Sequence, residues 1–283
     1  MITSSRQRET SRGRGKVAAR TVPIVLTIAG SDNSGGAGLQ ADLKTFTTLG
    51  VYGTTAVTCV VAEHPGRVLN ITPIPPGRVA DQIRLVLEAF PVAAIKTGML
   101  YSAEIIAAVS KAIKPALARS VPLVIDPVMV ASTGRVLLEK KAIRALEEFL
   151  PRAALITPNR DEAALLWGRP ITDLESLEAA AVDLTRRFRH PHFLVKGGHL
   201  KTGQAVDILA SPDGKLQHFR AKRIPGIDPH GTGCTYSAAI TAGLARGLTL
   251  TESVVLGKVF ITRALRRRFE IGRYQLLNHL PAL

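Results

Sequence analysis

The feature that most constrains the fold is an alternation of short apolar runs with amphipathic helical stretches, which begins at Val22. Apolar runs of about four to eight residues are typical of buried strands, whereas longer amphipathic stretches are typical of helices packed on a sheet. Strands separated by helices form a parallel sheet that is covered on both faces. The sequence therefore predicts an α/β protein with three layers, α/β/α, around a mostly parallel central sheet.

The expected elements follow one another along most of the chain. Strands are expected at 23–30, 54–62, 93–96, 123–126, 154–157 and 193–196, with a late antiparallel hairpin formed by 206–210 and 216–221. Helices are expected at 37–49, 79–90, 103–117, 140–149, 161–167, 174–188, 235–245 and 251–269. We expect one domain over residues 22–283, preceded by a flexible basic arm over residues 1–21.

Charge gives a reason to consider nucleic acid as a partner, because the formal net charge is +15. The excess is local, however, since residues 1–20 and the C-terminal helix contain much of it. No RNP motif, zinc finger or basic groove studded with aromatic residues is present. Nucleic acid is therefore not expected to be the main ligand.

The lack of long apolar runs and the small number of cysteines argue against membrane, secreted and disulfide-rich proteins. No stretch approaches the roughly 20 continuous apolar residues of a membrane helix, and the N-terminus has no apolar signal-peptide core. The two cysteines, Cys59 and Cys234, do not suggest a disulfide framework. We expect a cytoplasmic enzyme that does not contact a membrane.

In parallel sheets, ligands bind beyond the carboxyl ends of the strands. The residues that follow the expected strands are polar or rich in glycine: Gly30-Ser31-Asp32, Glu63-His64, Thr97-Gly98-Met99, Asp126-Pro127, Thr157-Pro158-Asn159 and Lys196-Gly197-Gly198. Ordinary surface loops can have this composition too, so the chemistry depends on particular motifs.

The most informative motif is His230-Gly231-Thr232-Gly233-Cys234-Thr235, which directly precedes an Ala-rich helix. Glycines allow several backbone N–H groups to face one point, and the helix N-terminus adds a partial positive charge. This arrangement can stabilise the charge that develops on a transferring phosphoryl group. It is not a Walker A loop, and a glycine-rich helix start without chemistry is the alternative.

Cys234 lies at the N-terminus of that helix, where the helix dipole favours loss of the thiol proton. It could accept the proton of an attacking hydroxyl as a general base. Two alternatives stay open: an inert packing residue, or a covalent nucleophile with His230 as its base.

Asp126 and Glu162 are candidates for holding Mg²⁺ with ATP, because Mg²⁺ prefers one or two carboxylates plus water and phosphate oxygens. Glu162 could instead only stabilise the first turn of its helix. Lys196, Asn159 and Thr232 are candidates for nucleotide contacts, although most lysines are simply solvated.

The glycine-rich loop after the first strand, 30–38, does not have the G-x-G-x-x-G order of a dinucleotide-binding site. We expect this loop to face the substrate, with Asp42 just inside the following helix.

Taken together, these segments resemble the hydroxymethylpyrimidine and phosphomethylpyrimidine kinases of thiamine biosynthesis, which belong to the ribokinase-like superfamily. The matching motifs occur in family order: Leu26-Thr-Ile-Ala-Gly-Ser-Asp32, Ser34-Gly-Gly-Ala-Gly-Leu-Gln-Ala-Asp-Leu-Lys-Thr-Phe46, Lys96-Thr-Gly-Met-Leu100, Ile125-Asp-Pro-Val-Met-Val130, Ile156-Thr-Pro-Asn159 with Glu162, Val195-Lys-Gly-Gly-His-Leu200 and His230-Gly-Thr-Gly-Cys-Thr235. The resemblance covers roughly residues 22–280.

The resemblance implies ATP and Mg²⁺ as cofactors and two successive phosphorylations of a small pyrimidine. On the matching positions it implies Cys234 as the base and Gly231 to Gly233 as the anion hole. It also implies that Lys196 contacts the ATP phosphates and that Asp126 and Glu162 organise Mg²⁺. The expected substrate contacts are Gly30, Asp42, Glu63 and Met99, and we expect a homodimer.

The chain departs from the family pattern in two places. Glu63 stands where the family usually has Gln, and an ionised carboxylate only accepts hydrogen bonds, whereas an amide also donates them. The second departure is the segment Gly226-Ile227-Asp228-Pro229 before His230. The Glu63 change makes a pyridoxal kinase of the same superfamily the main alternative. A non-catalytic relative associated with nucleic acid is a further one.

Overall fold

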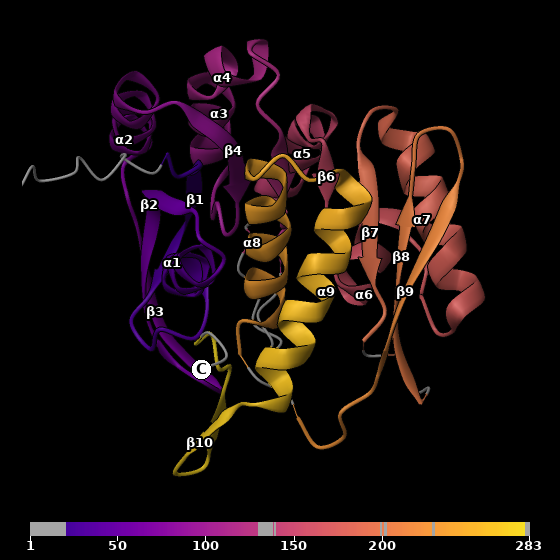
Figure 1. The fold of residues 1–283 in the computed structure, drawn as a ribbon. Helices are drawn as coiled ribbons and strands as arrows, with labels where there is room; N and C mark the ends of the chain where they lie inside the picture. Colours follow the sequence, from indigo (N-terminus) through magenta and orange to yellow (C-terminus); the bar gives the residue numbers. More distant parts are fainter. Residues whose placement is uncertain are drawn as a thin grey trace, which may run out of the picture.

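The computed structural model describes residues 21–129, 138, 140–198, 200, 203–227 and 230–280, and its central feature is a nine-stranded sheet (Figure 1). The strand order is β3-β2-β1-β4-β5-β6-β7-β8-β9. Strands β1, β2 and β4 to β7 run parallel, while β3, β8 and β9 are antiparallel to their inner neighbours. The strands are β1 (Ile24–Asp32), β2 (Tyr52–His64), β3 (Arg67–Pro73), β4 (Val92–Thr97), β5 (Leu123–Ile125), β6 (Leu155–Ile156), β7 (His192–Lys196), β8 (Gln204–Ala210) and β9 (Leu216–Lys222).

Helices cover both faces of this sheet, which confirms the predicted three-layer α/β/α fold (Figure 1). One layer consists of α1 (Gly38–Thr48), α8 (Thr232–Ala245) and α9 (Leu250–Arg266). The other consists of α2 (Pro76–Ala89), α3 (Ala103–Ala112), α4 (Lys114–Ala118), α5 (Lys140–Phe149), α6 (Arg160–Trp167) and α7 (Leu174–Phe188). Within the described residues, no helix has the length and apolarity needed to cross a bilayer.

Helix α8 is enclosed by the sheet, α1 and α9, and its residues from Thr235 to Gly243 are all buried. Small side chains make this possible. A Cβ added at Gly257 of α9 would lie only 2.8 Å from side-chain atoms of Tyr236 and Ile240 of α8. Close packing on three sides leaves little freedom for α8, so its N-terminus has a fixed place above the sheet.

The connections on the two sides of β1 create a crevice at its carboxyl end. Helix α1 connects β1 to β2 over one face of the sheet, whereas the connection from β2 to β4 runs through β3 at the sheet edge and then through α2 on the other face (Figure 1). Loops that leave a sheet in opposite directions open a crevice at the point of reversal, where α/β proteins bind ligands. The loops after β1, β2 and β4 are therefore well placed for a substrate.

The structure differs from the sequence prediction mainly at exposed edges. Strand β3 was not predicted because its residues are mostly exposed and lack an apolar alternation. The small hairpin of β10 (Phe269–Ile271) and β11 (Tyr274–Leu276) is likewise outside the predicted set. The helix predicted over 103–117 is divided at Ile113, directly before Lys114 and Pro115. The predicted arm lies outside the described residues except for Thr21.

Candidate active site

The Asp126 carboxylate lies where four structural elements meet at the carboxyl edge of the sheet. Asp126 directly follows β5, and its Oδ1 accepts hydrogen bonds from Lys196 Nζ at the end of β7 (3.1 Å) and from the Thr157 hydroxyl after β6 (3.2 Å). Its Oδ2 accepts a bond from the Ser237 hydroxyl of α8 (3.1 Å). The sequence predicted separate roles for Asp126 and Lys196, and the structure brings the two side chains together.

Both members of this pair keep their charges. Burial opposes ionisation of Asp126, but Lys196 and Lys96 hold the pKa of Asp126 below its usual range. Burial also opposes the Lys196 ammonium, but Asp126 and Glu162 raise the pKa of Lys196. The Lys196 side chain is 14% exposed against 3% for Asp126, so the cation is the more accessible partner for an incoming phosphate.

Glu162 belongs to the same edge of the sheet but is held by backbone groups. Its Oε2 accepts the Asn159 N–H (2.8 Å), while the Asn159 side chain accepts the Glu162 N–H, which forms a capping box at the start of α6. Its Oε1 accepts the Met129 N–H at 3.1 Å. Burial, followed by the Asp126 charge, raises the pKa of Glu162 to about 7. Glu162 therefore caps the start of α6 and also lies close enough to Asp126 to be influenced by its charge.

The carboxylates of Asp126 and Glu162 suit a hard divalent cation. Both are buried, both supply oxygen atoms, and the Asp126 charge raises the pKa of Glu162, as expected for two carboxylates that share one region. Each carboxylate has about four lone-pair sites, and the hydrogen bonds described above leave some of them open. This oxygen-donor set fits Mg²⁺, which binds through one or two carboxylates together with water and phosphate oxygens.

The glycine turn faces the same pair. Gly231 caps the N-terminus of α8 with a φ of 83°, and a Cβ there would collide with the Gly36 carbonyl oxygen. A Cβ on Gly233 would lie 3.2 Å from Lys196 Nζ and 3.6 Å from Asp126 Oδ2. Thr232 is the first residue of α8. The turn 231–233, Lys196 and Asp126 therefore surround one place, as an anion hole beside a cation requires.

Cys234 lies in the first turn of α8, as predicted, but its thiol is not poised to ionise. Burial, together with the charges of Asp126 and Asp42, raises the pKa of Cys234 to about 12. Lys96 and the N–H of Gly38 at the start of α1 favour the thiolate, but their effect is smaller than that of burial. The helix dipole alone predicts a more acidic thiol, whereas the pKa of the partly buried Cys234 is raised, because desolvation and the nearby carboxylates oppose the thiolate.

The residues predicted on the substrate side lie close together around the end of β1. A Cβ on Gly30 would lie 2.8 Å from Cys59 Sγ and 3.7 Å from Met99 Sδ. Cys59, Val61 and Met99 form a small apolar cluster, against which Val128 packs. Gly30 thus leaves room beside a soft, apolar wall that the sequence did not reveal as a unit.

Asp42, the other predicted substrate residue, is held in a buried ion pair. Its Oδ2 accepts bonds from Lys96 Nζ at 2.9 Å and from the Thr27 hydroxyl at 2.6 Å, and neither charged side chain is exposed. Burial opposes the Lys96 ammonium, but Asp42, Cys234 and Asp126 raise the pKa of Lys96. Lys96 was not among the predicted site residues, although it ends the strand expected at 93–96, and a lysine at the end of an expected strand was the reason for choosing Lys196.

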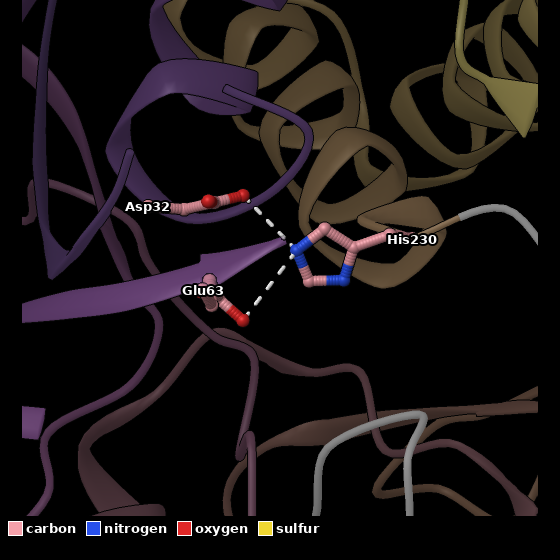
Figure 2. A group of neighbouring side chains, drawn as sticks. All are labelled: Asp32, Glu63 and His230. Atoms are coloured by element: carbon pink, nitrogen blue, oxygen red, sulfur yellow. Dashed lines mark hydrogen bonds and ion pairs between the residues drawn. The ribbon is translucent and has the colours of Figure 1, made fainter. Parts of the chain in front are cut away.

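Asp32, Glu63 and His230 form a group of three side chains at the ends of β1 and β2 and before α8 (Figure 2). His230 Nε2 lies 3.0 Å from Asp32 Oδ2 and 3.8 Å from Glu63 Oε2. The sequence singled out Glu63 for its departure from the family pattern, whereas it gave Asp32 no role of its own. Of the second departing segment, Asp228 and Pro229 lie outside the described residues.

Comparison with known proteins decides the family. The family model described as phosphomethylpyrimidine kinase matches residues 32–279. The chain belongs to the phosphomethylpyrimidine kinase family. It is therefore a small-molecule kinase with a ribokinase-like fold, as the sequence motifs indicated.

Individual relatives agree with this family. The hydroxymethylpyrimidine/phosphomethylpyrimidine kinase of Synechococcus elongatus is 43% identical over 256 residues, which cover 90% of this chain and 95% of that protein. The thiamine biosynthesis bifunctional protein ThiED of Geobacter sulfurreducens is 45% identical, but the match covers 91% of this chain and 52% of that protein. An ADP complex of Bacillus subtilis pyridoxal kinase has a TM-score of 0.82 at 36% identity, covering 92% of this chain and 98% of that chain.

The buried Lys96–Asp42 pair predicts a large loss of stability when one partner is removed. Lys96→Met leaves the Asp42 carboxylate buried without its cation, and we expect a loss of about 3–5 kcal/mol in the free energy of unfolding, measured by urea denaturation. Adding Asp42→Asn should restore part of this loss, because the unpaired charge is then gone.

A matched control is Arg84→Met, since Arg84 pairs with Glu88 while both side chains are 57% exposed. It should change stability little, because water screens such a pair. Equal effects of the Lys96 and Arg84 variants would contradict the importance of the buried pair.

Proposed function

We propose that this protein phosphorylates 4-amino-5-hydroxymethyl-2-methylpyrimidine and then the resulting monophosphate, with ATP and Mg²⁺. The observation that carries the proposal is the meeting of the glycine turn 231–233, Lys196 and Asp126 at one point of a chain whose relatives include kinases named for these substrates. Phosphoryl transfer requires mainly positioning and charge stabilisation, which these groups can supply.

In this proposal each residue near Asp126 has a distinct task. Asp126 and Glu162 would hold Mg²⁺ directly or through water, and the ion would supply positive charge for the phosphate oxygens. Lys196 contacts the ATP phosphates, while Asn159 and Thr232 contribute further nucleotide contacts. The N–H groups of the turn 231–233 face the transferring phosphoryl group, where the N-terminus of α8 favours negative charge.

Cys234 is proposed to act as a thiolate: the partly exposed thiol first gives its own proton to solvent, and the thiolate then accepts the proton of the attacking hydroxyl late in the transfer. Its thiol is protonated in the free protein because burial raises its pKa to about 12. The loose transition state of phosphoryl transfer demands little deprotonation of the nucleophile before bond formation. Lys96 and the Gly38 N–H are the groups that favour the thiolate as the proton leaves.

The substrate ring is proposed to lie beside Gly30 and Met99, with Glu63 facing its polar edge. Burial raises the pKa of Glu63, and the Asp32 charge adds to this effect, whereas His230 opposes it. A carboxylate can accept a bond from the exocyclic amine of the pyrimidine. A second candidate substrate is pyridoxal, because the structure of Bacillus subtilis pyridoxal kinase matches 92% of this chain.

The experiment that tests the function is coupled ADP release with Mg-ATP, in which the hydroxymethylpyrimidine, its monophosphate and pyridoxal are offered in parallel. We expect turnover of both pyrimidines and a much smaller kcat/KM for pyridoxal. Turnover of pyridoxal alone would support the second candidate and contradict the first. Glu63→Gln should change the ratio of the pyrimidine and pyridoxal kcat/KM values, and an unchanged ratio would remove Glu63 from substrate selection.

Replacement of the thiol tests the role of Cys234. Cys234→Ala should lower kcat by about 10²–10⁴-fold, the usual contribution of a general base, while ATP binds with nearly unchanged affinity. Calorimetry measures the ATP affinity, and single-turnover kinetics measures the transfer step. A turnover number near that of the natural protein would eliminate Cys234 from the mechanism.

Three further expectations belong to this proposal. One kinase domain would extend over residues 22–283, the enzyme would work in the cytoplasm, and it would be a homodimer. Individual apolar side chains on β2, β3 and α2 are exposed, among them Tyr52, Leu69 and Leu85, and a dimer interface could cover some of them. Sedimentation of the purified protein tests the last point, and a monomer at all concentrations would contradict it.

A further inference from the structure

Asp32 organises the loop between β1 and α1 through an unusual number of donors. Its carboxylate accepts the N–H groups of Ser34, Gly36 and Ala37, the Ser34 hydroxyl and Nε2 of His230, at 2.7–3.1 Å. Burial opposes ionisation, but the bonds from His230, Ser34 and Ala37 lower the pKa of Asp32 to about 2. Asp32 is therefore a fixed negative charge inside the loop that faces the substrate.

Four of these five donors come from the same loop, whereas His230 comes from the far end of the chain. His230 directly precedes Gly231, the N-cap of α8, so its backbone leads straight into the glycine turn 231–233. The backbone of this turn also touches the loop, because a Cβ on Gly231 would collide with the Gly36 carbonyl oxygen. A Cβ on Gly36 would in turn lie 3.0 Å from the His230 ring. The turn and the loop are thus joined by backbone packing and by one side chain.

The charge of that side chain depends on two carboxylates. Asp32 from β1 and Glu63 from β2 are the charged groups that act on the imidazole, which is 16% exposed (Figure 2). Burial opposes the imidazolium, but the hydrogen bond and charge of Asp32 and the charge of Glu63 raise the pKa of His230. A protonated His230 therefore balances one of the two negative charges at the substrate side.

Asp32, Glu63 and His230 each offer one possible metal-ligand atom, and these atoms lie within 4.8 Å of one another. A metal ion could therefore bind here in place of the proton on His230. The hydrogen bonds argue for a proton instead. Asp32 Oδ2 already accepts four donors, including His230 Nε2 at 3.0 Å. A metal would have to displace these donors from the atom that faces Glu63 and His230.

We propose that His230 is a positioning residue: its imidazolium fixes the phosphate-binding turn 231–233 against Asp32 and balances the charge of Glu63 beside the substrate. The residue acts through the turn and through Glu63 rather than on the transferring phosphoryl group. Because Glu63 stands on the substrate side, the state of His230 links ring recognition to the anion hole. The kinetic part of this inference rests on the proposed function, whereas the charge of His230 can be measured without any substrate.

The first test is an NMR titration of the histidine ring protons in the full-length protein, with His230 assigned by the loss of its signal in His230→Gln. We expect a pKa above the ordinary histidine value of about 6.5. Glu63→Gln should lower it by roughly half a unit to one unit, because a charge close to the ring is removed. A His230 pKa at or below the ordinary value, or one that Glu63→Gln leaves unchanged, would overturn the proposal. Addition of Zn²⁺ before the titration tests whether a metal ion binds here instead, and loss of the His230 titration at stoichiometric metal would also overturn the proposal.

The second test is the pH dependence of kcat for the pyrimidine substrate. The imidazolium is present below the pKa of His230 and is lost as the pH rises through it, so kcat should fall on this basic side. Glu63→Gln should lower the pKa of His230 and so move the fall in kcat to lower pH. His230→Gln keeps a donor for Asp32 but has no charge, and should lower kcat by about 10–100-fold and abolish the fall. The same basic fall in His230→Gln would contradict the proposal.

His218→Gln is the matched control, because His218 also pairs with a carboxylate, Glu178 (2.8 Å), on the exposed surface between α7 and β9. It should leave both kcat and the pH profile unchanged. Should His230→Gln fail to fold, the titration of the natural protein against Glu63→Gln still decides the matter, with the His230 signal assigned by backbone-correlated spectra. Absence of pyrimidine turnover in the natural protein would refute the proposed function while leaving the titration result intact.

Discussion

The arrangement of the site depends on the hydrogen bonds that the Asp126 carboxylate accepts. The carboxylate joins the ends of β5, β6 and β7 to helix α8 through Thr157, Lys196 and Ser237. A buried carboxylate costs several kcal/mol unless it is paired and hydrogen-bonded, and here three donors from three other elements satisfy it. The register of α8 over the sheet, and with it the position of the glycine turn, is thus tied to the charge balance of Asp126.

A second buried pair, Lys96–Asp42, extends this charge balance toward the substrate side. The two pairs are electrostatically connected, because Lys96 lowers the pKa of Asp126 and Asp126 raises that of Lys96. Cys234 lies within the field of both lysines, yet burial is the larger effect and keeps the thiol protonated. The site therefore combines buried ion pairs with a thiol that must lose its own proton before it can act as a base.

The sequence predicted the sheet and most of its strands, because buried parallel strands are continuous apolar runs that end in polar residues. It did not predict β3, whose exposed residues lack that pattern, or the break at Ile113. It placed Asp126, Glu162 and Lys196 at one edge but could not give their partners. Asp32 and Lys96 were overlooked, since their importance lies in contacts with His230 and Asp42, at sequence separations of 198 and 54 residues. The state of the Cys234 thiol was predicted with the wrong sign, because a sequence shows a helix N-terminus but does not show desolvation.

In the proposed function, one site carries out two successive phosphoryl transfers to the same small pyrimidine. The most direct measurement is ³¹P NMR of a reaction that contains the protein, Mg-ATP and the hydroxymethylpyrimidine. We expect a phosphomonoester signal that appears first and then gives way to a coupled pair of diphosphate signals, while ADP accumulates. Consumption of ATP that yields only inorganic phosphate, or no phosphorylated pyrimidine at any time, would contradict the proposed function.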